Sequence, residues 1–351
     1  MMQIYINGLG NVSPQNTLDN SSFLEEITYH QDYFKVIEPN YKEFISPASA
    51  RRMGRVIKMG VAAANYCLRD AKVENPDAII TGTGMGCLED TENFLCNILN
   101  NKEQFLTPTS FIQSTHNTVG AQIALLLTCN NYNFTYVHRD LSFESAFVDS
   151  ILLLKEGEAS NVLLGGVDEM THNHYSIHAK KGVWKKGATT SEFFNKNSKG
   201  TIPGEGAAFF SLSSSPKDPY AIVLAVEILF NTNSHEDLKM ILDKIFSSNN
   251  IEAKDIDLIL IGTNGDKEGD KVYSEFKENF FKENNSAAFK NLCGEYSTSS
   301  AFGVWLASQI LKKKEIPACV SLSHTPEKEV NKILLYNHYH GNHSLILLSS
   351  C

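Results

Sequence analysis

Two stretches of the chain resemble each other and decide the fold: "DAIITGTGMG" covers residues 77–86, and "DLILIGTNG" covers residues 257–265. In each stretch a short apolar run ends at glycine, which is typical of a buried strand that enters a turn. The offset between them is 180 residues (257 minus 77). A second similarity joins "STHNTVGAQIALLL", from Ser114, to "STSSAFGVWLASQIL", from Ser297, at an offset of 183 residues (297 minus 114). We interpret the two ordered matches as an internal duplication.

Strand and helix patterns alternate around these stretches. The runs "IYINGLG", "NVLLGGVDE" and "GEGAAFFSLS" predict buried strands, and residues 50–71 predict a helix because their apolar residues recur at helical spacing. This alternation predicts an α/β fold with mostly covered sheets. Serine, proline and charged residues cluster in "SLSSSPKDPY" at 211–220, which predicts a break there. We therefore expect two halves, residues 1–215 and 216–351.

The composition narrows the class of protein. The chain of 351 residues is 42% hydrophobic and 20% charged, as in soluble globular proteins. A net charge of -9 argues against nucleic acid as a partner, because phosphate binding needs a basic face. The seven cysteines contain no Cys-x-x-Cys pair, which favours reduced thiols in the cytoplasm. No signal peptide is recognisable and no apolar run approaches the ~20 residues of a membrane span, so we expect a cytoplasmic protein.

Three motifs suggest chemistry that their context does not support. His138-Arg139-Asp140 matches the start of a kinase catalytic loop, but the other kinase motifs are missing. The glycines at 82, 84 and 86 lack the spacing of a dinucleotide fingerprint. Two histidine groups have no obvious carboxylate or thiolate partner, so we predict neither a metal site nor a cofactor; they are His172, His174 and His178, and His338, His340 and His343.

The stretch "DLSFESAFVDSILLLKEG" at 140–157 predicts a buried helix, because it has almost no polar face. Asp140 stands where an N-cap is expected, and Gly157 stands where a C-cap is expected. The start of a buried helix is an anion site when it opens into a pocket, and a cysteine there would be an activated nucleophile. In this chain the position holds a carboxylate, and a plain helix cap is the simpler interpretation.

The order of the motifs resembles that of the β-ketoacyl-acyl-carrier-protein synthases of the thiolase-like superfamily. The similar segments include "IYINGLGNVSP", "RRMGRVIKMGVAAANYCLRDA", "TGTGMGCLED", "FIQSTHNTVGAQIALLL", "GEASNVLLGGVDE", "NKNSKGTIPGEGAA" and "KNLCGEYSTSSAFG". The resemblance covers nearly the whole chain. It implies a five-layered αβαβα architecture built from two duplicated halves.

The catalytic Cys-His-His triad of that family has no counterpart at the matching positions. The resemblance places Asp140 at the cysteine, Gly262 at the first histidine and Glu295 at the second, while the family's lysine is kept as Lys290. A carboxylate attacks a thioester poorly, and an anionic Glu295 would repel an enolate, so we expect no condensation. We expect Asp140 and Glu295 to pair with Lys290 and Arg139. Further candidate substrate-binding residues are His138, Arg139, Asn264 and Asn342.

The resemblance also implies partners. The segment with Phe111, Ile112 and Gln113 is similar to the interface strand of the family, so we expect a homodimer or a heterodimer with a catalytic ketosynthase subunit. Cysteine-less, trimmed members resemble the chain length factors of type II polyketide systems, such as those for aryl-polyene or flexirubin pigments, which work with an acyl carrier protein. Two alternatives stay open: an acyl-processing enzyme that uses Asp140, Glu295 or a serine (Ser142 or Ser145, with His138 as base), and a condensing enzyme that uses Cys293.

Overall fold

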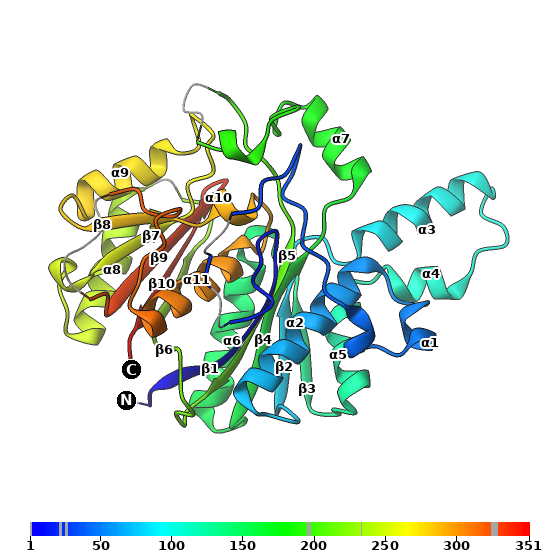
Figure 1. Ribbon diagram of the computed structural model, residues 1–351, viewed down its shortest axis with the longest axis horizontal. Coiled ribbons are helices and arrows are strands. Elements are labelled where there is room, and N and C mark those ends of the chain that lie inside the picture. The colour runs from blue at the N-terminus through cyan, green and yellow to red at the C-terminus, as the bar shows by residue number, and fades with distance from the viewer. Residues whose placement is uncertain (1, 21–22, 25–26, 195–197, 233, 324–328) are drawn as a thin grey trace.

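The computed structural model describes residues 2–20, 23–24, 27–194, 198–232, 234–323 and 329–351 (Figure 1). The strands before residue 215 are β1 (Ile4–Val12), β2 (Ala78–Gly82), β3 (Tyr132–Tyr136), β4 (Asn161–Asp168) and β5 (Gly206–Ser213). Those after it are β6 (Ala221–Leu229), β7 (Leu258–Ile261), β8 (Asn285–Ala288), β9 (Lys332–Tyr339) and β10 (Asn342–Ser349). The strands predicted from the sequence correspond to β1, β2, β4, β5 and β7.

These strands form one ten-stranded sheet in the order β3-β2-β4-β5-β1-β6-β10-β9-β7-β8. The two halves of this order are equivalent: β1 to β5 recur, strand by strand, as β6 to β10. In each half two antiparallel pairs lie inside and two parallel pairs lie outside. The predicted duplication is confirmed, because β2 and β7 hold equivalent places. The predicted boundary at 215/216 falls between β5 and β6, and a division there remains our proposal.

The helices before residue 215 are α1 (Pro47–Ala50), α2 (Arg55–Ala71), α3 (Leu88–Asn100), α4 (Pro108–Gln113), α5 (Thr118–Leu127), α6 (Ser142–Glu156) and α7 (His172–Lys180). Those after it are α8 (His235–Asn249), α9 (Lys271–Phe280), α10 (Lys290–Cys293) and α11 (Ser299–Lys313). Short 3₁₀ turns lie at Tyr41–Glu43, Arg139–Leu141, Thr190–Glu192 and Ala253–Asp255. None of the described helices is both long and apolar enough to cross a membrane.

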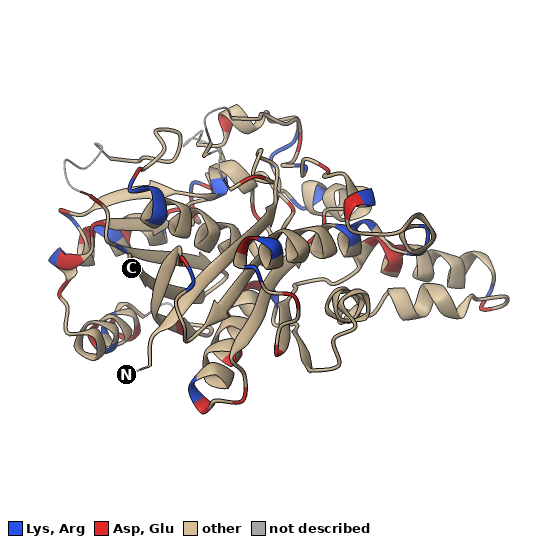
Figure 2. Cartoon of the chain, turned by 60° about the horizontal axis from the view of Figure 1, so that its bottom comes forward, with Lys and Arg blue, Asp and Glu red and all other residues tan. Residues whose placement is uncertain are grey.

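The helices and strands make five layers. Helices α2 and α5 share one apolar cluster with the first-half strands, and α8 and α9 share another with the second-half strands. Between the two half-sheets, α6 and α11 form the central cluster, which takes side chains from both halves. Figure 2 shows that charged residues lie mainly on helices and loops, while the strands carry few. The predicted αβαβα architecture is confirmed.

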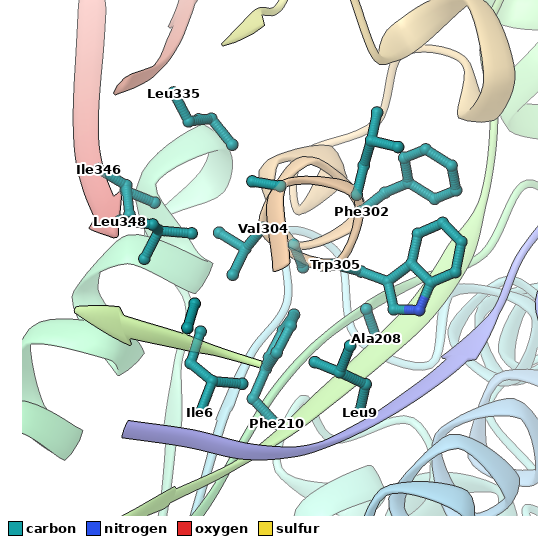
Figure 3. Close-up of a cluster of buried hydrophobic side chains, with 14 of the residues drawn as sticks. Ile6, Leu9, Ala208, Phe210, Phe302, Val304, Trp305, Leu335, Ile346 and Leu348 are labelled. Carbon is teal, nitrogen blue, oxygen red and sulfur yellow. The ribbon is translucent and has the colours of Figure 1, made fainter. Parts of the chain in front are cut away.

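Helix α11 is the centre of the core. Every residue from Ser299 to Leu311 is buried. In Figure 3, Phe302, Val304 and Trp305 lie between first-half side chains and second-half side chains; those labelled are Ile6, Leu9, Ala208 and Phe210, and Leu335, Ile346 and Leu348. A helix that is apolar on all sides is stable only when it is covered all round. The two half-sheets provide that cover.

Our interpretation of the second sequence match, between residues 114–127 and 297–311, is wrong: these two segments are not equivalent parts of the duplication. Helix α5 lies between β2 and β3, whereas α11 lies between β8 and β9, so the counterpart of α11 is α6. The environments differ too, because Leu125 of α5 is 70% exposed while α11 is buried along its length. A serine-threonine turn before an apolar helix is a local pattern, and local patterns do not specify the place of a helix in the chain order.

The expected interface segment is a helix and not a strand. Phe111, Ile112 and Gln113 belong to α4, which packs with α3 on an arm that projects from the body of the protein (Figure 1). The strand at the sheet edge is β3, which pairs with β2 on one side only. Pro108 at the first helical position and the polar Thr107 before it favour a helix start, and this signal was available in the sequence.

Candidate functional site

The two central helices begin at the same place. The 3₁₀ turn Arg139–Leu141 leads into α6, and the segment that carries Glu295 and Ser297 leads into α11. The Ser297 hydroxyl donates to Oδ1 of Asp140 at 3.3 Å, which joins the two helix starts. A cavity of about 660 Å³ opens here and is lined from both halves, by Met85, Asp140, Glu169, Trp184, Glu295 and Tyr339 among others.

Asp140 is not the N-cap that we expected. The cap residue of α6 is Leu141, which makes no side-chain cap bond. The Ser142 hydroxyl organises the turn instead: it accepts the N–H of His138 at 2.8 Å and donates to the carbonyl of Arg139 at 2.6 Å. Because this turn satisfies the local backbone, the Asp140 carboxylate is left to line the cavity. Gly157 ends α6 in the left-handed conformation, as predicted.

A buried ion pair lies beside Asp140. The Lys290 ammonium contacts both Glu295 carboxylate oxygens, at 2.8 and 2.9 Å, and its side chain is fully buried. The Asn264 amide donates to Oε2 of the same carboxylate at 2.8 Å. A buried charge is tolerated when it is paired and hydrogen-bonded, and both conditions are met here. Arg139, the other expected cation, forms no ion pair within the described part of the chain.

The Asp140 carboxyl group titrates near neutral pH. Burial and, next, the negative charge of Glu295 raise its pKa to about 7, while Lys290 and the Ser297 hydrogen bond oppose the shift. Asp140 is therefore close to half protonated at neutral pH. The cavity holds one carboxyl group that can donate or accept a proton.

Gly262 leaves no room for a histidine. A Cβ atom at this position would lie 2.4 Å from Oδ1 of Asn337 and 2.8 Å from the Tyr273 hydroxyl, well inside contact distance. The next atom in its way is Cε of Lys290, at 3.2 Å. The space next to Gly262, where the resemblance places the family's first histidine, is thus filled by neighbouring side chains, including the lysine of the ion pair.

The buried carboxylate of Asp168 ties the two halves together, and sequence reasoning missed it. It accepts N–H bonds from Gly84 at 2.8 Å and from Thr298 at 3.0 Å, and hydroxyl bonds from Thr83 and Thr298. These backbone N–H donors of the glycine turn at 82–86 are therefore hydrogen-bonded within the protein. They are not free to bind a dinucleotide, so the turn is not a dinucleotide-binding site. Asp168 directly follows the strand sequence "LLGGV", and this position could have identified it from the sequence, because the carboxyl ends of neighbouring strands meet at one edge of a sheet.

The remaining predicted residues separate into two groups. His138, Arg139 and Asn342 line the cavity, while Asn264 does not and instead holds Glu295. The cavity wall also contains residues that we had not assigned to it: His174, His178, Trp184, Phe230 and Tyr339. His138 packs against Phe230, and His174 stacks on His178. Most of this wall comes from α7 and the following loop, whose place over the site no local pattern reveals.

The histidine groups are held by hydrogen bonds and ring contacts. Both ring nitrogens of His343 have partners, the Tyr336 hydroxyl at 2.8 Å and the Thr232 carbonyl at 2.9 Å. His338 accepts the N–H of Gly341 at 3.1 Å. Among the described residues, no group of three or more His, Cys, Asp or Glu side chains is arranged to hold a metal ion.

The alternative nucleophiles are badly placed. The Ser142 hydroxyl is buried and committed to backbone bonds. Cys293 is fully buried, and burial raises the pKa of its thiol well above the usual value. Neither Cys293 nor any other cysteine of the described chain lines the cavity. The serine that does contact an acidic group in the cavity is Ser297.

Comparisons with known proteins agree with this architecture. Residues 30–193 match the family described as "Beta-ketoacyl synthase, N-terminal domain". No curated protein matches the sequence. The fold is thiolase-like. Residues 30–193 are similar to the N-terminal domain of β-ketoacyl synthases, in line with the order of motifs.

Solved structures match over the full length. The ishigamide ketosynthase/chain length factor has a TM-score of 0.83 at 18% identity, with 100% of this chain and 99% of that chain covered. A ketosynthase in complex with its chain length factor from Xenorhabdus doucetiae gives 0.78 at 14% identity, covering 100% and 98%. A type II acyl carrier protein in complex with its ketosynthase gives 0.74 at 14% identity, covering 100% of both chains. Identities this low establish the shared fold.

The buried ion pair yields a stability prediction. Lys290→Met leaves the Glu295 carboxylate buried without its cation, so the free energy of unfolding should fall by about 3–5 kcal/mol. The double variant Lys290→Met/Glu295→Leu removes both charges and should recover most of the loss. Urea denaturation measures both values. Lys254→Met, which breaks an exposed pair with Glu252, should change stability by less than about 1 kcal/mol. A Lys290→Met protein as stable as the Lys254→Met control would contradict this account.

Asp140 makes stability depend on pH. Its pKa is 3.8 when unperturbed and about 7 in the folded protein, so folding takes up a proton between these values. Stability from this group is therefore greatest below about pH 4 and declines as the pH rises to about 7. Asp140→Asn removes the group, and at pH 8 the variant should melt roughly 4 °C above the parent, with a much smaller gap at pH 5. Calorimetry at both pH values tests this, and an equal gap at both would be the contrary result.

Proposed function

We propose that the protein is a non-condensing partner subunit of a catalytic ketosynthase, of the chain-length-factor type, in fatty acid or type II polyketide synthesis. The observation that carries this proposal is the carboxylate of Asp140 at the cavity start of α6, next to the buried Lys290–Glu295 pair. The pigment pathways named above, for aryl polyenes and flexirubins, are the systems we consider first. A cytoplasmic location is part of the same proposal and is supported by seven unpaired cysteines.

The chemistry of the cavity supports the absence of condensation. Condensation requires a thiolate that holds the acyl chain, and an acyl group on a carboxylate would be an anhydride that water cleaves. It also requires donors that stabilise an enolate, and the loss of one such donor typically costs roughly 10²–10³ in rate. The resemblance assigns one donor position to Glu295, which is paired with Lys290, and the other to Gly262, where a Cβ atom has no space.

The main cavity suits an acyl chain that is not covalently bound to this protein. Its wall is largely apolar and aromatic, with Met85, Val137, Trp184, Phe230 and Tyr339 among the lining residues. Such a surface binds a hydrocarbon or polyene segment by removing it from water. A subunit that contains this space without a nucleophile can shape a growing chain that a partner subunit holds. That role is the one implied by the resemblance to chain length factors.

The outer surface has candidate contact sites for a ketosynthase subunit and for an acyl carrier protein. Tyr132 and Phe134 on the unpaired edge of β3 are 43% and 47% exposed, and Phe111 and Ile112 on α4 are 57% and 63% exposed. An open strand edge beside apolar side chains favours association with another subunit. Three exposed lysines, Lys180, Lys181 and Lys186, flank Trp184 at the cavity and suit an acidic acyl carrier protein.

An activity assay tests the proposal. The purified protein should show no condensation with acyl- and malonyl-carrier protein, whereas its complex with a cysteine-bearing ketosynthase should be active. Ile112→Glu places a charge in the expected contact, so the activity of the mixture should fall by at least tenfold with the loss of the complex on size-exclusion chromatography.

A matched control separates this effect from general damage. Ile177→Glu alters a side chain of similar exposure, 54%, on α7 away from α4, and the complex should survive it. Condensation by the protein alone, abolished by Asp140→Asn, would overturn the partner role.

A second candidate function rests on the Ser297–Asp140 contact. A carboxylate with a pKa near 7 is well matched to remove a proton from a hydroxyl at neutral pH. Ser297 would attack the thioester carbonyl, its proton would pass through Asp140 to the leaving thiol, and water would then release the acid. This would make the protein an acyl-thioester hydrolase.

Thioester hydrolysis distinguishes the two candidates. If the partner role is right, release of free thiol from an acyl-carrier thioester should stay at the uncatalysed rate for the parent and for Ser297→Ala. A hydrolase would show turnover that Ser297→Ala reduces by at least 10³-fold, and an acyl adduct on Ser297 in mass spectrometry.

A further inference from the structure

A second cavity, of about 800 Å³, lies against the segment 262–270. Alternate residues of this segment serve the two sites. Gly262 faces Lys290 and Asn264 holds Glu295, whereas Thr263 and Gly265 line the second cavity. One stretch of chain therefore forms a wall of both sites.

The second cavity is basic although the protein carries a net charge of -9. Four lysines line it: Lys267, Lys271, Lys277 and Lys282. Two of them have carboxylate partners, since Lys271 pairs with Glu268 and Lys282 pairs with Glu278.

The other two lysines, Lys267 and Lys277, have no carboxylate within 4.0 Å among the described residues. The half-buried Lys277 ammonium donates to the Ser286 hydroxyl at 2.8 Å. Two positive charges at one cavity are therefore left without a counter-ion.

The acidic residues of the segment, Asp266, Glu268 and Asp270, form no ion pair with Lys267 or Lys277. Asp266 accepts the N–H groups of Gly200 at 2.6 Å and Gly269 at 3.0 Å, and Glu268 pairs with Lys271. The Asp270 carboxylate accepts the N–H groups of Asn264 at 2.8 Å and of Gly265 at 2.9 Å, so it is engaged with its own backbone. Glu278 is engaged with Lys282 at 3.1 Å. The Ser286 hydroxyl, which accepts from Lys277, can donate its own proton to an oxyanion, whereas the Ser274 hydroxyl donates to the Asp270 carbonyl at 3.2 Å.

The cavity also has an apolar part. Phe194, Ile261 and Leu322 contribute to its lining. A ligand that satisfies all of these groups has an anionic head and an apolar body. A phosphate monoester carries a charge of about −1.5 to −2 at neutral pH, which two lysines match better than they match the single charge of a carboxylate.

We propose that this second cavity is a binding site for a phosphorylated small molecule with an apolar portion. The phosphate lies between Lys267 and Lys277, and the apolar portion lies toward Ile261 and Leu322. Binding holds the segment 262–270 in place, and through Asn264 it holds Glu295 in the first cavity. The site is independent of whether the first cavity performs chemistry.

Calorimetric titration of the full-length protein with phenyl phosphate, inorganic phosphate and benzoate tests the proposal. Phenyl phosphate should bind most tightly, and benzoate, which has the same ring and one charge, should bind at least tenfold more weakly. Lys267→Gln and Lys277→Gln should each raise the Kd for phenyl phosphate about tenfold, since each removes one charge-assisted hydrogen bond. Hydrogen exchange at the amides of Asn264 and Gly265 should slow when phenyl phosphate binds.

Lys155→Gln is the matched control, because Lys155 is an exposed lysine at the end of α6 and outside the second cavity. Its Kd should equal that of the parent. Lys267 is exposed, so its variant tests the site even if Lys277→Gln does not fold. Equal affinity for benzoate and phenyl phosphate would overturn the phosphate assignment. A Kd that none of the cavity lysines changes, or no saturable binding, would overturn the site.

Discussion

The burial of α6 and α11 between the two half-sheets is the constraint on which the rest of the structure depends. Helix α11 is buried on all sides from Ser299 to Leu311, and α6 buries the face that carries Phe143, Phe147 and Leu154, so both helices are stable only when they are covered by the sheets. The duplicated strand order supplies two such sheets, joined by the short pairing of β1 with β6. Because both helices start at the junction of the halves, their N–H-rich ends converge there. The main cavity lies at that point of convergence.

The electrostatics of this point explain the choice of side chains. Two helix N-termini create a positive potential, which favours an anion. In this protein the anions are its own carboxylates: Asp140 lies before α6 and Glu295 lies before α11. The buried Lys290 limits the repulsion between the two. Burial first, and then the negative charge of Glu295, raise the pKa of Asp140 to about 7. This geometry is the basis of our proposal that the protein does not catalyse condensation.

The same interior links the site to the outer layers of the second half. The segment after β7 holds Glu295 on one side and borders a basic cavity on the other, so a ligand in either place acts on one backbone. Asp168 plays the corresponding part in the first half, since its carboxylate bonds to the glycine turn after β2 and to the start of α11. Each half thus supports the site through a carboxylate that accepts N–H groups of the turn after its second strand.

The sequence by itself determined the α/β class, the duplication seen at 77–86 and 257–265, and the positions of Asp140, Lys290 and Glu295. These follow from patterns within short windows and from their order. Only the tertiary structure decided that Leu141 and not Asp140 caps α6, that α4 is a helix on a projecting arm with α3, and that α11 is the counterpart of α6. These depend on which distant segments meet, because burial and hydrogen-bond partners come from contacts across the chain.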